Sequence, residues 1–209
     1  MSRKLTPESL WEKIDSLMRS SSTEQIRNPT GQVKKCLEEW LPIYHYCIKR
    51  RRLGLSLTVQ LDESEEYPDA VVELNGFDSE VINVEVAFVK DYEDALRSEL
   101  LNDSGWCPGV GPISRDKISG DILAEMHAYS GGSIAAKTYQ SIRDRVLKKV
   151  EKNYSHSTDL IVGYYCHDAA RHKPSEDQLK MIYSCISNPI RSVYLVNLYD
   201  NHIIASSII

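Results

Sequence analysis

Two carboxylates in neighbouring apolar segments are the residues of this sequence best suited to chemistry. Asp69 begins the apolar segment 70–74, and Glu85 lies in the middle of the apolar segment 81–89. An unpaired carboxylate in a low-dielectric environment shifts its pKa and becomes neutral. A bound cation keeps two carboxylates charged side by side, and ligation by oxygen alone suits Mg²⁺ (or Mn²⁺) with water completing the octahedron. The pattern therefore predicts a metal site at Asp69 and Glu85.

The two segments have the composition of β-strands joined by a short hairpin. Alternate side chains of a strand face the same way, so Asp69 shares a face with Val71, and Glu85 shares one with Ala87. Pairing of the strands then brings Asp69 and Glu85 within reach of one cation. The alternative is a solvated turn at Asp69 and a Glu85 that pairs with an arginine such as Arg143.

The order of these residues resembles the PD-(D/E)XK superfamily of nucleases. Pro68-Asp69 on one strand, a short hairpin and Glu85 on the next strand match its motif, but Ala87 stands where the family has its lysine. The resemblance implies that Asp69, Glu85 and the backbone carbonyl of Val86 hold Mg²⁺. It also implies that a lysine orients the attacking water and offsets the developing negative charge.

A helix predicted over residues 133–154 offers a substitute for the missing lysine. At the helical period, Lys149 falls on one boundary of its apolar face and Arg143 on the other. Some members of the superfamily supply the cation from a neighbouring helix. We therefore expect Lys149 to act as the catalytic lysine and Arg143 to contact a phosphate or a carboxylate. The alternative for both is a surface cation whose stem covers apolar surface.

Other charged residues lie on the second helix of the chain. The basic cluster Arg50, Arg51 and Arg52 at its end is expected to contact nucleic-acid phosphates, and compensation of the helix dipole is the alternative. Glu38 and Glu39 flank the apolar stripe of this helix, so we expect them to be solvated.

Hydrophobic periodicity, caps and turn residues predict the elements that position these side chains. Thr6-Pro7 starts a loosely attached leading helix, and Asn28-Pro29 starts a second one with a bend at Pro42. The remaining elements are predicted as strands 55–61, 70–74 and 81–89, a helix 91–101, an irregular stretch 102–117, a short helix around 122–126, a helix 133–154, a strand 159–165, a helix after Ser175, and strands 193–198 and 203–208.

This order matches an αβββαβ core. We therefore expect a single α/β domain with a mixed central β-sheet flanked by helices, of the restriction-endonuclease-like type that the resemblance implies. The nuclease domain is expected over residues 29–209, with a helical extension over residues 1–28.

Composition narrows the function classes. The net charge of −5 argues against nonspecific coating of nucleic acid, and no apolar run reaches the roughly 18 residues of a membrane span. Five scattered cysteines without a CxxC favour free thiols in the cytoplasm.

The resemblance implies a metal-dependent DNA endonuclease that hydrolyses phosphodiester bonds, with DNA and no membrane among its partners. By analogy we expect a homodimer or a subunit of a larger defence or mobile-element complex. The alternative is a catalytically inactive protein of the same fold that acts as a binding scaffold. Ala87 and the negative net charge favour that alternative.

Overall fold

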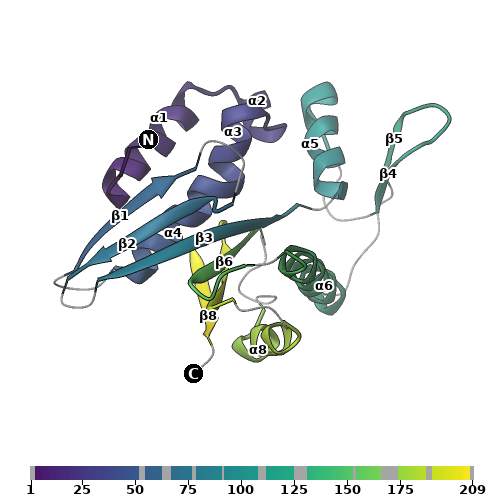
Figure 1. Ribbon diagram of the computed structural model, residues 1–209. Helices are drawn as coiled ribbons and strands as arrows, with labels where there is room; N and C mark the ends of the chain where they lie inside the picture. Colours follow the sequence, from purple (N-terminus) through teal and green to yellow (C-terminus); the bar gives the residue numbers. More distant parts are fainter. Residues whose placement is uncertain are drawn as a thin grey trace.

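A mixed β-sheet forms the centre of the molecule. The computed structural model describes residues 3–51, 55–62, 67–76, 79–90, 92–107, 112–124, 131–152, 154–165, 174–186 and 190–207. In these ranges one sheet has six strands in the order β1-β2-β3-β6-β7-β8 (Figure 1). The strands are β1 (Ser56–Leu61), β2 (Ala70–Asn75), β3 (Glu80–Val89), β6 (Thr158–Tyr164), β7 (Ser192–Asn197) and β8 (His202–Ser207). β1, β2 and β3 pair antiparallel, β3, β6 and β7 pair parallel, and β8 is antiparallel to β7.

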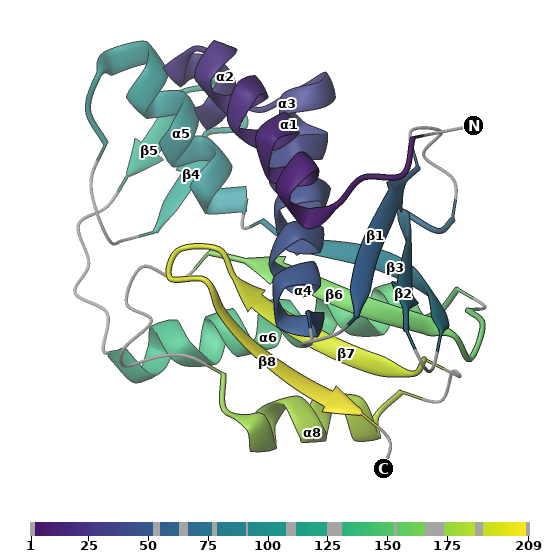
Figure 2. The ribbon, with the colours of Figure 1, turned by 90° about the vertical axis from the view of Figure 1, so that its left-hand side faces the viewer.

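Helices cover both faces of this sheet, as the sequence predicts. Figures 1 and 2 show α1 and α4 against one face and α6 and α8 against the other. α5 leads to a small second sheet of β4 and β5. The bounds are α1 (Pro7–Ser20), α2 (Thr23–Arg27), α3 (Gly31–Lys35), the π-helical turn η1 (Cys36–Trp40), α4 (Leu41–Arg50), α5 (Tyr92–Ser104), β4 (Ile113–Arg115), β5 (Ile122–Ala124), α6 (Gly131–Val150) and α8 (Glu176–Ser184).

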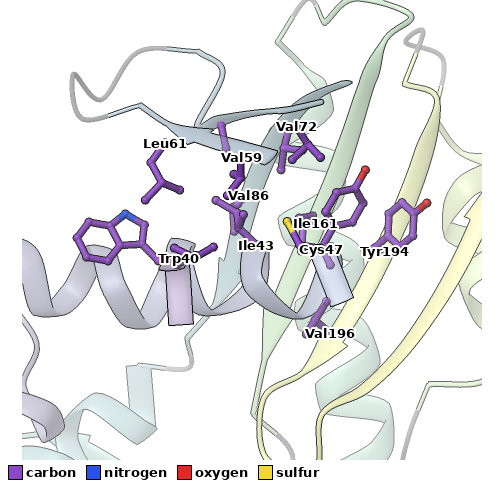
Figure 3. Packing of buried hydrophobic residues seen from close by; sticks show 14 of the residues in the cluster. Trp40, Ile43, Cys47, Val59, Leu61, Val72, Val86, Ile161, Tyr194 and Val196 are labelled. Carbon is purple, nitrogen blue, oxygen red and sulfur yellow. The ribbon is translucent and has the colours of Figure 1, made fainter. Parts of the chain in front are cut away.

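Alternation along β3 separates two hydrophobic clusters. Val84 and Val86 belong to the cluster under α4, whereas Ala87 belongs to the cluster under α6 and α8. Figure 3 shows Val86 pointing toward Trp40 and Ile43 of the helical layer. Because successive side chains of a strand point to opposite faces, Glu85 lies on the α6 side of the sheet, together with Ala87.

The leading helix α1 is an integral part of the core. The Thr6 side chain accepts a hydrogen bond from the Ser9 backbone N–H at 3.2 Å, as expected for an N-cap. Leu10 is 0% exposed and belongs to the cluster under α4. Leu5 pairs with Val59 of β1 through two backbone hydrogen bonds of 2.8 Å. The expectation of loose attachment was wrong, since strand pairing and burial both tie this segment to the sheet.

The second helix changes its winding in the middle. α3, η1 and α4 are continuous, and in η1 the Leu41 backbone N–H donates to the Cys36 carbonyl, an i→i+5 bond. Pro42 follows at once, where its ring provides no N–H for a helical hydrogen bond. The chain was predicted to bend at Pro42, and the structure shows a π turn directly before it.

The short helix predicted around residues 122–126 is wrong, because Ile122–Ala124 forms strand β5. Asp116 accepts hydrogen bonds at its Oδ1 from the Ile118 and Ser119 backbone N–H groups at 2.7 and 2.8 Å. Gly120 then adopts φ 78°, a conformation that glycine reaches without strain. This turn folds β5 back onto β4, so local turn chemistry overrides the apolar spacing from which the helix was inferred.

Across the described ranges, no helix combines the length and the apolar composition needed to cross a bilayer.

The lack of space around Gly163, between β6 and α4, predicts a stability effect. A Cβ atom at Gly163 of β6 would lie 2.9 Å from Pro42 Cγ and 3.0 Å from Phe88 Cδ2. We expect Gly163→Ala to lower the free energy of unfolding by about 1–3 kcal/mol, measured by urea denaturation, because the added methyl group would overpack the core there. The Pro42→Ala change removes the nearer atom, so the cost of Gly163→Ala is also measured in a protein that carries Pro42→Ala, where we expect it to be smaller. An equal cost of Gly163→Ala in both backgrounds would contradict the steric explanation.

Candidate active site

The site lies where the β2–β3 ladder ends. The last pair of this ladder is Ala70 opposite Val84, whereas β3 continues along β6 to Val89. Asp69 directly precedes Ala70 and therefore lies across from Glu85. It takes the place of the missing strand partner, since its Oδ2 accepts a hydrogen bond from the Val86 backbone N–H at 2.7 Å. The N–H and C=O of one strand residue point to the same side, so the Val86 carbonyl is also directed toward Asp69.

Glu85 is a buried carboxylate that has, among the described residues, one cationic partner at hydrogen-bond distance. The residue is 2% exposed. The Lys149 ammonium lies 2.5 Å from its Oε1, and the Tyr154 hydroxyl donates to the same oxygen at 3.3 Å. Its Oε2 is buried and has no hydrogen-bond partner in the described part of the chain. One oxygen is thus occupied by protein groups, and the other is left bare in a low-dielectric environment.

Lys149 approaches Glu85 from a neighbouring helix. It belongs to the last turn of α6, and its side chain is 18% exposed. Ala87 faces the same side of β3 as Glu85 and is fully buried. The structure therefore brings three sequence-predicted residues together, Asp69, Glu85 and Lys149. Glu85 pairs with Lys149 and not with Arg143, the partner in the alternative interpretation.

A third carboxylate, Glu39, influences the same site. Burial, followed by the nearby Asp69 carboxylate, raises the pKa of Glu39 to about 7, although Lys35 and Lys149 oppose the shift. Burial, followed by Glu85, also raises the pKa of Asp69. The expectation that Glu39 is solvated was wrong, since its side chain is only 30% exposed. The π turn that contains Glu39 shifts the helical phase, so a projection at 3.6 residues per turn misplaces it.

Tyr154 is a site residue to which sequence reasoning assigned no role. It follows the end of α6 and is 6% exposed. The available signal was its position shortly after Lys149, but the spacing of a residue beyond a helix end does not fix its direction.

The basic residues at the end of α4 are engaged within the protein. Arg50 donates to Glu80 Oε2 at 2.8 Å, and Arg51 donates to Glu8 Oε1 at 2.7 Å. Glu80 also pairs with Arg191, which binds the buried Asp159 through its Nε at 2.8 Å. Arg52 lies outside the described residues. Contact of these arginines with nucleic-acid phosphates stays a prediction, and for Arg50 and Arg51 such contact would compete with the ion pairs.

Arg143 lies on the central part of α6, away from the Glu85 contact. It is half-buried and has no ion pair or hydrogen bond with the described part of the chain. Its charge is therefore available to an anionic ligand.

The oxygen atoms near Asp69 fit a hard cation. No three histidine, cysteine, aspartate or glutamate side chains of the described residues converge into a metal-binding group by themselves. Mg²⁺ does not require three, since it keeps several waters and takes one or two carboxylates. Asp69, the bare Glu85 Oε2 and the Val86 carbonyl supply oxygen donors only, which is the chemistry that Mg²⁺ and Mn²⁺ prefer.

Comparison of the chain with protein-family models, with curated proteins and with solved structures found no match. Two acidic side chains, a bare buried oxygen and a partly desolvated ammonium lie together at the end of a strand ladder. Such a group of residues can hold a hydrated divalent cation and a negatively charged substrate.

The raised pKa of Glu39 predicts a pH-dependent stability. Between the unfolded pKa near 4.5 and the folded pKa near 7, the native state binds the proton more tightly, so stability falls as pH rises through this window. Glu39→Gln mimics the protonated form. In EDTA we expect it to be more stable than wild type by about 2 kcal/mol at pH 8 and by almost nothing at pH 4.5, measured by urea denaturation.

The adjacent Glu38→Gln change removes the same charge one residue away and is the matched control. If both variants gain stability equally at pH 8, the net charge of the protein is responsible and not the surroundings of Glu39.

Proposed function

We propose that this protein is a metal-dependent endonuclease that hydrolyses phosphodiester bonds in DNA and has the restriction-endonuclease-like fold of the PD-(D/E)XK superfamily. The observation that carries the proposal is the Lys149 ammonium, 2.5 Å from Glu85 on the strand next to Asp69. A lysine from α6 thus supplies the cation that Ala87 lacks. The order of α4, β1, β2, β3, α6 and β6 also agrees with the αβββαβ core that the resemblance implies.

The metal of this proposal is Mg²⁺ or Mn²⁺, held by Asp69, Glu85 Oε2 and the Val86 carbonyl. When bound, such an ion lowers the pKa of a coordinated water and offsets charge on a phosphate. Asp69 also has a structural role, because the hydrogen bond that it accepts from the Val86 N–H holds the backbone that carries the Val86 carbonyl. Loss of the Asp69 carboxylate therefore removes one ligand and releases another.

Lys149 supplies the cation of the proposed mechanism. Its ammonium is partly desolvated, which strengthens its interaction with anions relative to a surface lysine. It balances the Glu85 charge and orients the attacking water by hydrogen bonds, since an ammonium has three donors. Arg143 is the candidate for a phosphate contact, because it has no partner among the described residues.

Glu39 is the candidate for accepting a proton. Its pKa near 7 matches the value at which a general base works best at neutral pH. The Asp69 carboxylate raises the pKa of Glu39 and the Lys149 ammonium lowers it, so Glu39 senses the charges of the proposed site.

A binding scaffold without catalysis is the second candidate, and one observation favours it. The Lys149 ammonium already neutralises Glu85, so the pair is chemically satisfied without a metal. In a scaffold this pair is a structural ion pair, and Asp69 serves only to bind the Val86 N–H.

Plasmid cleavage separates the two candidates. We expect wild-type protein to nick supercoiled DNA with Mg²⁺ or Mn²⁺ and not with EDTA. Asp69→Asn and Lys149→Met are each expected to reduce the rate by a factor of at least about 100, because a metal ligand or the water-orienting cation is lost. Lys148→Met changes the same side-chain type at the adjacent, exposed position of α6 and is expected to retain activity.

The scaffold is supported if wild-type protein cuts neither double-stranded nor single-stranded DNA with either metal. Cleavage that survives Asp69→Asn would contradict the proposed site even if the protein is a nuclease.

A further inference from the structure

The two oxygens of the Glu85 carboxylate have unlike surroundings. Oε1 is 2.5 Å from the Lys149 ammonium, 3.3 Å from the Tyr154 hydroxyl and 3.9 Å from the Lys152 ammonium. Oε2 is buried and has no hydrogen-bond partner among the described residues. A buried carboxylate with all its donors on one side and none on the other is unusual, because buried acceptors are normally satisfied.

The lysines do not explain this asymmetry by themselves. An ammonium is a compact point charge with rotatable donors on a flexible stem, so it can contact either oxygen or both. The last torsion of a glutamate is broad and roughly two-fold, so the carboxylate can rotate at little cost. A donor with a fixed direction is needed to hold Oε1 on the lysine side.

The Tyr154 hydroxyl is such a donor. Tyr154 is 6% exposed, and its ring contacts the Tyr67 ring at 5.4 Å between centroids, with an interplanar angle of 52°. Tyr67 is itself held at its hydroxyl, which lies 2.6 Å from Thr158 Oγ1. A phenol hydroxyl is protonated at neutral pH, so it serves as a donor to Glu85 Oε1.

We propose that Tyr154 is a positioning residue that fixes the rotation of the Glu85 carboxylate, so that Oε1 binds the protein cations and Oε2 is reserved for a divalent metal ion. This inference rests on the proposed metal site. Without the hydroxyl, the carboxylate can turn both oxygens toward Lys149, and the ammonium then competes with the metal. Tyr154 acts through Glu85 and is not expected to touch the substrate.

Mn²⁺ binding to the full chain without DNA tests whether Tyr154 keeps Glu85 Oε2 available to a metal ion. Free Mn²⁺ is measured by electron paramagnetic resonance during a titration at pH 7. We expect Tyr154→Phe to weaken Mn²⁺ binding about 10-fold, within the range found when a partner of a metal ligand is removed. Tyr139→Phe is the matched control on α6, because its ring packs on the same cluster and its hydroxyl has no partner in the described part of the chain. It is expected to bind Mn²⁺ like wild type.

A second background shows whether Tyr154 acts through Glu85. In the Glu85→Gln background the additional Tyr154→Phe change is expected to alter Mn²⁺ affinity less than about 2-fold, because two residues that act through one interaction are not additive. A full 10-fold effect in that background would overturn the proposal and indicate a general packing defect. Equal Mn²⁺ affinity of Tyr154→Phe and wild type would also overturn it.

These outcomes are distinct from failure of the proposed function. If wild-type protein binds Mn²⁺ with the expected dependence on Tyr154 but cuts no DNA, the positioning role of Tyr154 is supported and the proposed nuclease function is contradicted. If wild-type protein cuts DNA and Tyr154→Phe has no effect on Mn²⁺ binding, the nuclease function is supported and the positioning role of Tyr154 is overturned. Wild-type protein that binds no Mn²⁺ overturns both.

Discussion

The burial of a charged Glu85 in the central strand is the constraint on which the arrangement of the site depends. A carboxylate that is 2% exposed needs a compensating charge nearby, and β3 itself supplies none on that face, where the next residue is Ala87. The compensating Lys149 comes from α6, whose Ile142 and Val146 pack in the cluster under that helix. A buried ion pair adds little net stability, but removal of one partner is costly. The pair therefore favours one position of α6 on the sheet over neighbouring ones.

Asp69 lies beside this pair because the unpaired backbone of β3, beyond the end of the β2–β3 ladder, needs a hydrogen-bond partner. β3 is longer than β2, and every backbone polar group of its unpaired part requires a partner. Asp69 satisfies the Val86 N–H with a side-chain oxygen, at the cost of bringing its own carboxylate toward Glu85. The raised pKa of Asp69, caused by burial and then by Glu85, is the electrostatic result of that proximity. Two carboxylates are thus brought close together by unrelated structural demands.

The sequence predicted those parts of the site that follow a simple period. Alternation along β2 and β3 placed Asp69 and Glu85 on one face, and the helical period placed Lys149 at the boundary of the α6 face that packs on the sheet. The sequence-based predictions were wrong or incomplete where the regular helical or strand period is interrupted. The π turn moved Glu39 toward Asp69, the Asp116 turn converted the expected helix near residue 122 into β5, and Tyr154 lies beyond the helix whose phase would have located it. The packing of α1 was also missed, because its apolar face is ordinary for a helix and its bridge to β1 is a long-range contact.

The small size of Ala87 is related to the position of Lys149. Ala87 lies two residues after Glu85 on the same face, fully buried in the cluster that also contains Val146 and Tyr154. A long side chain at position 87 would occupy volume that α6 and Tyr154 now fill, and close-packed interiors accept added atoms only with displacement. The small residue on the strand therefore permits the close approach of the helix, and the close approach lets a helical lysine reach Glu85. The ammonium beside Glu85 therefore comes from a helix, at a place on the sheet where the strand itself carries only a small side chain.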